Sequence, residues 1–341
     1  LLSKIDYWFL AQIQVIAEFS QGFGTQELNY TNLLQAKQFG LSDAFIADLH
    51  GLNELEVRTL RKKYAVIPVV KQVDSAAGEF KALSNYLYLS YHGSHHDLVP
   101  SKEHLCILGS GPYSIGSSVE FDWCCVNLAR EVRKRKQRVI IINSTPETVS
   151  TAYDESDRLS FERVADILDY EQCTGTVVCV GGQSANNLVI QLAALNYPLL
   201  GTSAANIHRA EDRQLFSQLL HDNAINQPAW MNAASQDQID DFITQIGFPL
   251  LVRPSYVLSG SAMKVATSSA DLALFLSAAA NISPNNSVVV SEFITNAKEV
   301  DVDGVARNGE VVFLAISEHL EQAGVHSGDA TLIYPAQSLS V

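Results

Sequence analysis

Apolar residues recur at helical spacing through the first part of the chain. They return every three or four positions in the runs 33–39 and 46–52, as expected for the buried face of a helix. Ser42 before the second run and Gly51 after it are typical of the start and the end of a helix. The pattern therefore predicts a mostly helical region over residues 1–100.

Between residues 103 and 203, short apolar runs alternate with helical stretches. An aromatic-rich run just before them, at 86–89, predicts a strand or an extended connector. Strands are predicted at 104–108, 138–143, 176–180 and 199–201, and helices at 119–135 and 185–195. This alternation is typical of parallel βαβ units, whose ligands bind at the carboxyl ends of the strands. The region therefore predicts an α/β domain with a parallel sheet.

From residue 204 to residue 341 the pattern changes to helices followed by several strands. Helices are predicted at 210–221 and 236–246, and strands at 249–253, 287–293, 299–306 and 310–316. Asn308-Gly309 between the last two strands is a strong signal for a tight hairpin. This region predicts an α+β domain that is separate from the parallel layer before it.

Composition narrows the classes of function. With 341 residues the chain is long enough for two or three domains. Its net charge of −14 argues against broad binding to nucleic acid, and no uncharged apolar run reaches the length of a membrane span. The five cysteines lack zinc-ligand spacing, so we interpret them as reduced, buried thiols of an intracellular protein. The histidine-rich run 92–97 is interpreted as a solvated loop in preference to a metal site.

Small residues follow the first predicted strand of the α/β region, at 109–111 and again at Gly116. Their spacing differs from the dinucleotide-binding fingerprint, whose third glycine comes two positions earlier. A tight loop that faces a small ligand or a domain interface is therefore favoured. Glu120 and Asp122 complement the dipole of the next helix, whereas Glu147 follows a strand, where a ligand would lie.

The third region carries a pattern typical of a nucleotide site. Arg253 ends a predicted strand, and its guanidinium suits the oxygens of a polyphosphate. The loop 259–261 is a glycine between two serines, which lets backbone amides approach phosphates. Glu299 begins another strand. Two interpretations of this residue stay open: a ligand of a ribose, or an exposed residue of a hairpin. The run 324–329 places a histidine, a serine and an aspartate among glycines, which favours a site loop.

Taken in order, these motifs resemble the large subunit of carbamoyl phosphate synthetase. The residues that carry the resemblance lie at 108–113, 116–123, 146–151, 181–183, 201–203, 210–213, 253–260 and 324–329. The likeness extends over essentially the whole chain. It implies a helical segment like the oligomerisation domain at 1–100, a preATP-grasp α/β domain at 103–203, and an ATP-grasp domain at 204–341 that continues beyond Val341. The run from Glu120 to Trp123 resembles the second, carbamoyl phosphate-forming half of eukaryotic-type enzymes.

The resemblance implies a ligase that uses ATP to phosphorylate carbamate. It assigns catalytic roles to Arg253, His326 and Asp329, and tunnel-lining roles to Ser114, Glu120 and Glu147. It assigns nucleotide binding to a longer set: Arg213, Arg253, Ser259, Gly260, Ser261, Glu292, Ile294, Glu299, Gly324, Val325, His326 and Ser327. The magnesium or manganese ligands are expected beyond Val341 and none within the chain, so the chain alone is expected to be inactive.

The same resemblance implies partners and leaves alternatives open. Expected partners are ATP, carbamate or bicarbonate, ammonia from a glutaminase subunit or domain, and the rest of an oligomeric large subunit with its first ATP-grasp half. Cytoplasm is the expected compartment, with the mitochondrial matrix as the alternative, and the product serves pyrimidine or arginine and urea synthesis. Ser114, Thr145 and Ala152 depart from the usual family residues, which leaves open a catalytically impaired regulatory or scaffold paralogue. Another ATP-grasp ligase, such as a biotin carboxylase, is disfavoured by the helical segment.

Overall fold

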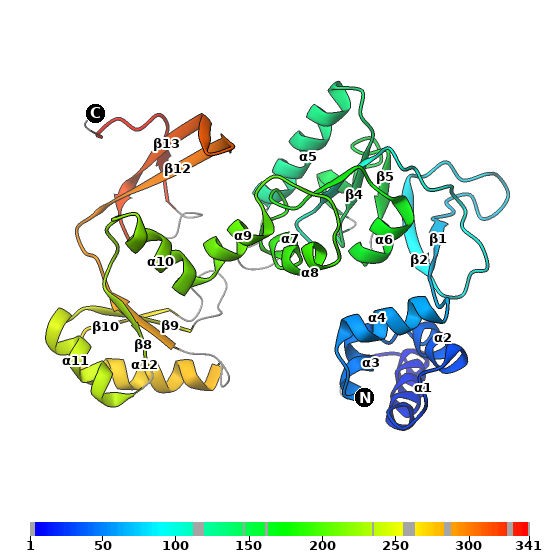
Figure 1. Ribbon diagram of the computed structural model, residues 1–341, viewed down its shortest axis with the longest axis horizontal. Coiled ribbons are helices and arrows are strands. Elements are labelled where there is room, and N and C mark those ends of the chain that lie inside the picture. The colour runs from blue at the N-terminus through cyan, green and yellow to red at the C-terminus, as the bar shows by residue number, and fades with distance from the viewer. Residues whose placement is uncertain are drawn as a thin grey trace. The chain divides into compact units, whose positions relative to one another are not determined.

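The computed structural model describes residues 4–111, 119–145, 147–160, 163–233, 235–254, 263–282, 288–325 and 330–339. The chain forms two compact units, Leu1–Glu211 and Asp212–Val341 (Figure 1). The boundary follows α9 (Ala204–Glu211), whose Ile207 packs into the core of the first unit. The change of sequence pattern at residue 204 therefore precedes the structural boundary.

Four helices open the first unit: α1 (Tyr7–Phe23), α2 (Tyr30–Gln38), α3 (Asp43–His50) and α4 (Glu54–Lys63). Each begins at a side chain that accepts a hydrogen bond from a free backbone amide, namely Asp6, Asn29, Ser42 and Asn53. Gly51 ends α3 with a φ of 64°, a left-handed conformation that glycine adopts without strain. The predicted helix start at Ser42 and end at Gly51 are confirmed.

The segment after α4 departs from the predicted helical region. It contains β1 (Val69–Gln72) and β2 (Tyr86–Ser90), which pair antiparallel with each other. β2 also pairs in parallel with β5 (Arg158–Ser160), so both strands extend the sheet of the α/β region. Leu87 and Leu89 are buried and alternate with more exposed residues, the period of a strand. The helices therefore end at Lys63, and the strand expected at 86–89 is confirmed.

The sheet of the first unit has seven strands in the order β1-β2-β5-β4-β3-β6-β7. Its other members are β3 (Leu105–Leu108), β4 (Val139–Ile142), β6 (Gly175–Val177) and β7 (Leu199–Leu200). Alternate residues of β3 belong to different cores, with Cys106 and Leu108 in one and Leu105 and Ile107 in the other. The second core includes residues of α5 (Val119–Lys134), and the first includes residues of α6 (Val164–Glu171), α7 (Gly182–Asn186) and α8 (Val189–Ala194). The sheet is therefore a middle layer, as predicted for a parallel α/β domain.

The second unit contains two antiparallel sheets. The first has the order β10-β9-β11-β8, from strands β8 (Trp230–Asn232), β9 (Leu250–Pro254), β10 (Lys264–Ala266) and β11 (Val288–Glu292). Helices α11 (Gln236–Ile246) and α12 (Ser269–Ile282) share a core with it, and α10 (Arg213–Asp222) opens the unit. The second sheet joins β12 (Lys298–Arg307), β13 (Glu310–Gln322) and β14 (Leu332–Ile333). Asn308 and Gly309 form the predicted hairpin turn, both with positive φ.

Candidate functional site

The first candidate site lies where the strand order of the parallel sheet reverses. The chain runs from β3 to β4 and β5 on one side, and then crosses back to β6 and β7 on the other. Such a switch point leaves a crevice beyond the carboxyl ends of the strands, where doubly wound sheets bind their ligands. The small-residue loop that begins at Gly109 follows β3 at this place.

Asn143 organises this crevice. Its side-chain oxygen accepts a hydrogen bond from the Gly111 amide at 3.0 Å, and its side-chain nitrogen donates to the Ser150 hydroxyl at 3.2 Å. A Cβ atom on Gly109 would lie only 2.7 Å from the Asn143 side chain, so the close approach requires glycine there. The Thr145 hydroxyl donates to the Gly111 carbonyl at 2.6 Å. The loops after β3 and β4 are thus tied to each other by side chains.

A cavity of about 730 Å³ lies at this end of the sheet. Residues of α4, β3, β4, α6 and α8 contribute to its walls. The lining is mostly apolar, with Leu55, Ile142 and Leu188. Its polar part comprises neutral and charged side chains, among them Asn143, Ser184, Asp43, Glu54, Arg58 and Arg163. A volume and lining of this kind are typical of small-molecule sites.

The acidic residues near the crevice have different environments. Asp122, interpreted as a helix-dipole residue of α5, is buried, and its carboxylate accepts a hydrogen bond from the Ser150 amide at 3.2 Å. It therefore also holds the short helix η1 (Val149–Thr151) against α5. Glu120 and Glu147 are exposed, at the start of α5 and in the loop after β4. Ser114, the third expected tunnel residue, lies outside the described residues.

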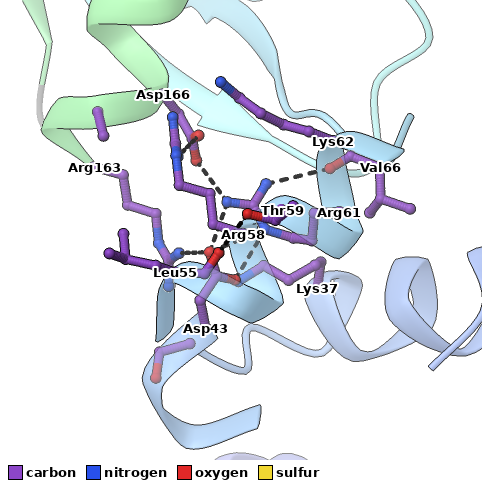
Figure 2. A network of polar contacts seen from close by, with 12 residues as sticks. Lys37, Asp43, Leu55, Arg58, Thr59, Arg61, Lys62, Val66, Arg163 and Asp166 are labelled. Atoms are coloured by element: carbon purple, nitrogen blue, oxygen red, sulfur yellow. Dashed lines mark hydrogen bonds and ion pairs between the residues drawn. The ribbon is translucent and has the colours of Figure 1, made fainter. Parts of the chain in front are cut away.

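A cluster of charged residues joins the helical segment to the α/β domain, and we call it the Asp43 junction (Figure 2). Its members are Lys37, Asp43, Arg58, Arg61, Lys62, Arg163, Asp166 and Asp169. Both Asp43 and Arg61 are almost fully buried, at 2% and 1% exposure. The pattern of the sequence missed this cluster, because Asp43 has the position of an ordinary first-turn residue of α3.

Asp43 is the centre of this junction. Its Oδ1 accepts a hydrogen bond from Lys37 Nζ at 2.9 Å, and its Oδ2 from Arg61 Nη2 at 2.6 Å. Arg163 Nη1 lies 2.8 Å from the same Oδ2. Arg61 Nη2 also donates to Asp166 at 3.2 Å, which links α4 to α6. Burial alone would raise the pKa of the Asp43 carboxyl, but the hydrogen bonds from Arg61 and the charge of Lys37 outweigh it and lower that pKa.

The second unit positions residues expected at a nucleotide site. Arg253 lies on β9 and pairs with Val289 of β11. Leu250 and Val252 point into the core shared with α11 and α12, so the alternation of the strand directs Arg253 to the opposite face. Glu292 ends β11, and its carboxylate accepts a hydrogen bond from the Ala229 amide at 3.2 Å. Ile294, two residues later, is exposed.

Three residues of the second antiparallel sheet converge beside the expected site loop. Glu299 Oε2 accepts a hydrogen bond from the Gly324 amide at 3.4 Å and lies 3.9 Å from His319 Nδ1. The other ring nitrogen of His319, Nε2, lies 3.0 Å from Asp301 Oδ2. The structure thus brings together Glu299 and Gly324, two predicted site residues far apart in sequence. It adds His319, which sequence reasoning missed.

The base of the site loop is fixed from both sides. The Glu321 carboxylate accepts hydrogen bonds from the Thr331 amide at 2.9 Å and the Thr331 hydroxyl at 3.0 Å. The Ala323 amide donates to the Ala297 carbonyl at 2.9 Å. These contacts position Gly324 and Val325 at the start of the loop.

Several expected site residues fall outside the description. His326, Ser327 and Asp329 of the site loop are not among the described residues, and neither are Ser259, Gly260 and Ser261 of the glycine loop. The backbone of Arg213 opens α10, but its side chain is outside the description as well.

The histidines and cysteines of the chain bear on metal and thiol chemistry. Across the described ranges, no group of three or more histidine, cysteine or acidic side chains is arranged to hold a metal ion. His96 accepts a hydrogen bond from the Val70 amide at 3.0 Å and stacks on Tyr170, so it is tied into the fold. Cys106 and Cys125 are buried as expected and Cys173 is half-buried, but Cys124 and Cys179 are exposed, so the prediction of buried thiols is wrong for these two. None of the described helices is both long and apolar enough to cross a membrane.

The fold of the chain is that of an ATP-grasp protein with a preATP-grasp domain. The biotin carboxylase domain of the 2-oxoglutarate carboxylase from Hydrogenobacter thermophilus, solved with MgADP, ADP and bicarbonate, has a similar fold with a TM-score of 0.51. The identity is 12%, over 64% of this chain and 51% of that chain, so this likeness shows the fold alone.

Family models cover most of the chain. The model of the carbamoyl-phosphate synthetase large chain oligomerisation domain matches residues 1–65, that of the preATP-grasp domain residues 101–209, and that of the ATP binding domain residues 212–341. The chain therefore belongs to the carbamoyl phosphate synthetase large-chain family, in the order oligomerisation, preATP-grasp and ATP-binding domain.

Similar proteins match along the whole chain. Multifunctional protein URA2 of Saccharomyces cerevisiae is 47% identical over 99% of this chain and 16% of its own length. The arginine-specific large chain of carbamoyl phosphate synthase from Cutaneotrichosporon cutaneum is 48% identical over 99% of this chain and 29% of its own. The mitochondrial, ammonia-type carbamoyl-phosphate synthase of Aquarana catesbeiana is 45% identical, over 99% and 23%. The chain thus spans less than a third of the length of these relatives.

Proposed function

We propose that this chain is the part of a carbamoyl phosphate synthetase that phosphorylates carbamate with ATP. A carbamate oxygen attacks the γ-phosphorus, the bond from that phosphorus to the β,γ-bridging oxygen breaks, and carbamoyl phosphate and ADP form. The observation that carries the proposal is the 45% and 48% identity to two proteins named as carbamoyl phosphate synthases, over 99% of the chain.

In this proposal the second unit holds ATP. Glu299 accepts hydrogen bonds from ribose hydroxyls, because its carboxylate is partly exposed and lies beside the start of the site loop. Arg253 contacts the phosphates from its face of β9, where a guanidinium neutralises charge that develops on the transferring group. We assign the adenine pocket to Glu292 and Ile294, and further phosphate contacts to Arg213 and to Ser259, Gly260 and Ser261. Gly324, Val325, His326, Ser327 and Asp329 complete the site.

Magnesium or manganese, when bound, would neutralise phosphate charge in such a reaction. The described residues offer no cluster that fits such an ion.

The first unit would deliver the substrate in this proposal. Ser114, Glu120 and Glu147 line a tunnel for carbamate, which is made from bicarbonate and from ammonia released by a glutaminase. The exposed positions of Glu120 and Glu147, near the carboxyl ends of β3 and β4, are compatible with that role. The rest of an oligomeric large chain, with its other ATP-grasp half, would supply the carbamate. The pathway is pyrimidine or arginine and urea synthesis, in the cytoplasm or the mitochondrial matrix.

A scaffold paralogue without turnover is the second candidate, favoured by Ser114, Thr145 and Ala152. The structure gives Thr145 a local function, because its hydroxyl ties two loops of the crevice together. This departure is therefore compatible with an ordered crevice and with activity.

The test replaces Arg253 by alanine in the full-length protein that carries this chain. A charge-assisted contact to phosphate is worth about 1.5–3 kcal/mol, so Arg253→Ala should raise the KM for ATP at least about tenfold in carbamoyl phosphate formation. Arg307→Ala is the matched control, because Arg307 is exposed at the end of β12. Unchanged ATP kinetics in Arg253→Ala would contradict the assignment, and a wild-type protein without turnover would favour the scaffold.

A further inference from the structure

His319 is a buried residue between two carboxylates. Its side chain is 0% exposed, whereas those of Glu299 and Asp301 are 36% and 40% exposed. Nε2 lies 3.0 Å from Asp301 Oδ2, and Nδ1 makes no hydrogen bond within the described part of the chain. A buried polar atom without a partner is unusual and calls for a functional or structural reason. Glu299 Oε2 lies 3.9 Å from Nδ1.

The strand register explains why these side chains meet. Asp301 pairs with Ser317, so His319 is two residues further along β13 and on the same face. Glu299 is two residues before Asp301 and shares that face too. The pairing shifts between Lys298 and Val300, and an irregularity of this kind re-aims side chains beside functional sites. The fold therefore directs Glu299 toward the ring and toward the loop that begins at Gly324.

We propose that His319 is a positioning residue that fixes the Glu299 carboxylate for the ribose of ATP. This inference rests on the proposed function, in which Glu299 is the ribose ligand. The Gly324 amide and the His319 ring both approach the same oxygen, Oε2. The other oxygen, Oε1, is then the acceptor for a ribose hydroxyl. Asp301 accepts from Nε2, and Nδ1 faces Glu299, to which it donates when the ring carries a proton on both nitrogens.

Through Glu299, His319 would affect which sugar the site accepts, an effect that a residue with only a packing role would not have. Closure of the site around nucleotide would shorten the 3.9 Å separation, because active-site contacts tighten when a ligand binds. A fixed carboxylate distinguishes a ribose from a deoxyribose, since an unpaired acceptor in the site disfavours the sugar that lacks the hydroxyl. His319 therefore controls the choice between ATP and its deoxy analogues.

The experiment measures KM and kcat of the full-length protein with ATP, 2′-deoxy-ATP and 3′-deoxy-ATP. We expect His319→Ala to raise the KM for ATP about tenfold with kcat within about twofold, and to remove most of the preference for ATP over one deoxy analogue. His319→Gln keeps one donor and should restore part of that preference. In a Glu299→Gln background, His319→Ala should have no further effect. His221→Gln, at an exposed position of α10, is the control.

The outcomes separate this inference from the proposed function. If Glu299→Gln loses the preference for ATP and both His319 variants keep it, His319 does not position Glu299, and the inference is wrong while the ribose assignment stands. If Glu299→Gln keeps the preference, the ribose assignment fails and the inference fails with it. Should His319→Ala not fold, Asp301→Ala removes the acceptor that holds Nε2 and must weaken the same preference for the inference to hold.

Discussion

The Asp43 junction and the Glu299–His319–Asp301 cluster both combine acidic side chains with nitrogen donors, yet they differ in which partner is exposed to water. At the junction the central carboxylate and its arginine are both buried, and cations surround Asp43. In the second unit the histidine is buried, but both carboxylates remain more than a third exposed. A carboxylate whose oxygens are all used by buried cations serves the architecture. A carboxylate that is held from one side and open on the other has an oxygen left for a ligand.

The largest effect should follow from breaking the junction. Asp43→Asn leaves Lys37, Arg61 and Arg163 without their shared anion, and removing one partner of a buried ion pair destabilises by about 3–5 kcal/mol. The measurement is chemical unfolding together with hydrogen exchange of α3 and α4. Asp48→Asn, at an exposed position of the same helix, is the control and should change the free energy of unfolding by less than about 0.5 kcal/mol. Equal values for the two variants would show that the junction does not stabilise the fold.

The next largest effect is the dependence of the free energy of unfolding on pH. Burial lowers the pKa of Lys37 to about 8 from its ordinary 10.5, against the attraction of Asp43. Between these two pH values the unfolded chain binds more protons than the folded chain, so the free energy of unfolding rises with pH. The total rise is about 1.4 kcal/mol for each unit by which the folded and unfolded pKa values differ. The contribution is fully present above pH 10.5 and is lost as the pH falls through about 8.

Lys37→Met should remove this rise, and the measurement is the difference between variant and wild-type unfolding free energies at several pH values from 7.5 upward. Lys62→Met is the control and should keep the wild-type slope, because the Lys62 side chain is half-exposed at the same junction. A Lys37→Met protein with the wild-type slope would mean that the folded protein keeps Lys37 as readily protonated as the unfolded chain does.

The sequence can predict features that depend on neighbouring residues better than contacts between residues that are far apart in the chain. Periodicity located α3 between Ser42 and Gly51 and the hairpin at Asn308-Gly309, because caps and turns depend on neighbouring residues. Motif order indicated Glu299 and Gly324, which the structure places 3.4 Å apart between Oε2 and the amide nitrogen. It could not indicate the pairing of Arg61 with Asp166, which are 105 positions apart, since no local pattern encodes a contact between domains. His319 was missed for a related reason, because its role depends on strand register.

The smallest effect on the free energy of unfolding should come from replacing Glu299. Glu299→Gln is the chemical counterpart of Asp43→Asn, since each replaces a carboxylate by an amide of nearly the same shape. Because the Glu299 side chain is 36% exposed and water can replace its contacts, we expect the free energy of unfolding to change by less than about 1 kcal/mol. The measurement is chemical unfolding of the second unit, followed through Trp230 of β8. The same variant should lose affinity for ATP, so at this position binding would be lost while stability is nearly kept, whereas Asp43→Asn is expected to lower stability. A loss as large as that of Asp43→Asn would instead make Glu299 a structural residue, because its carboxylate would then have no oxygen to spare for a nucleotide.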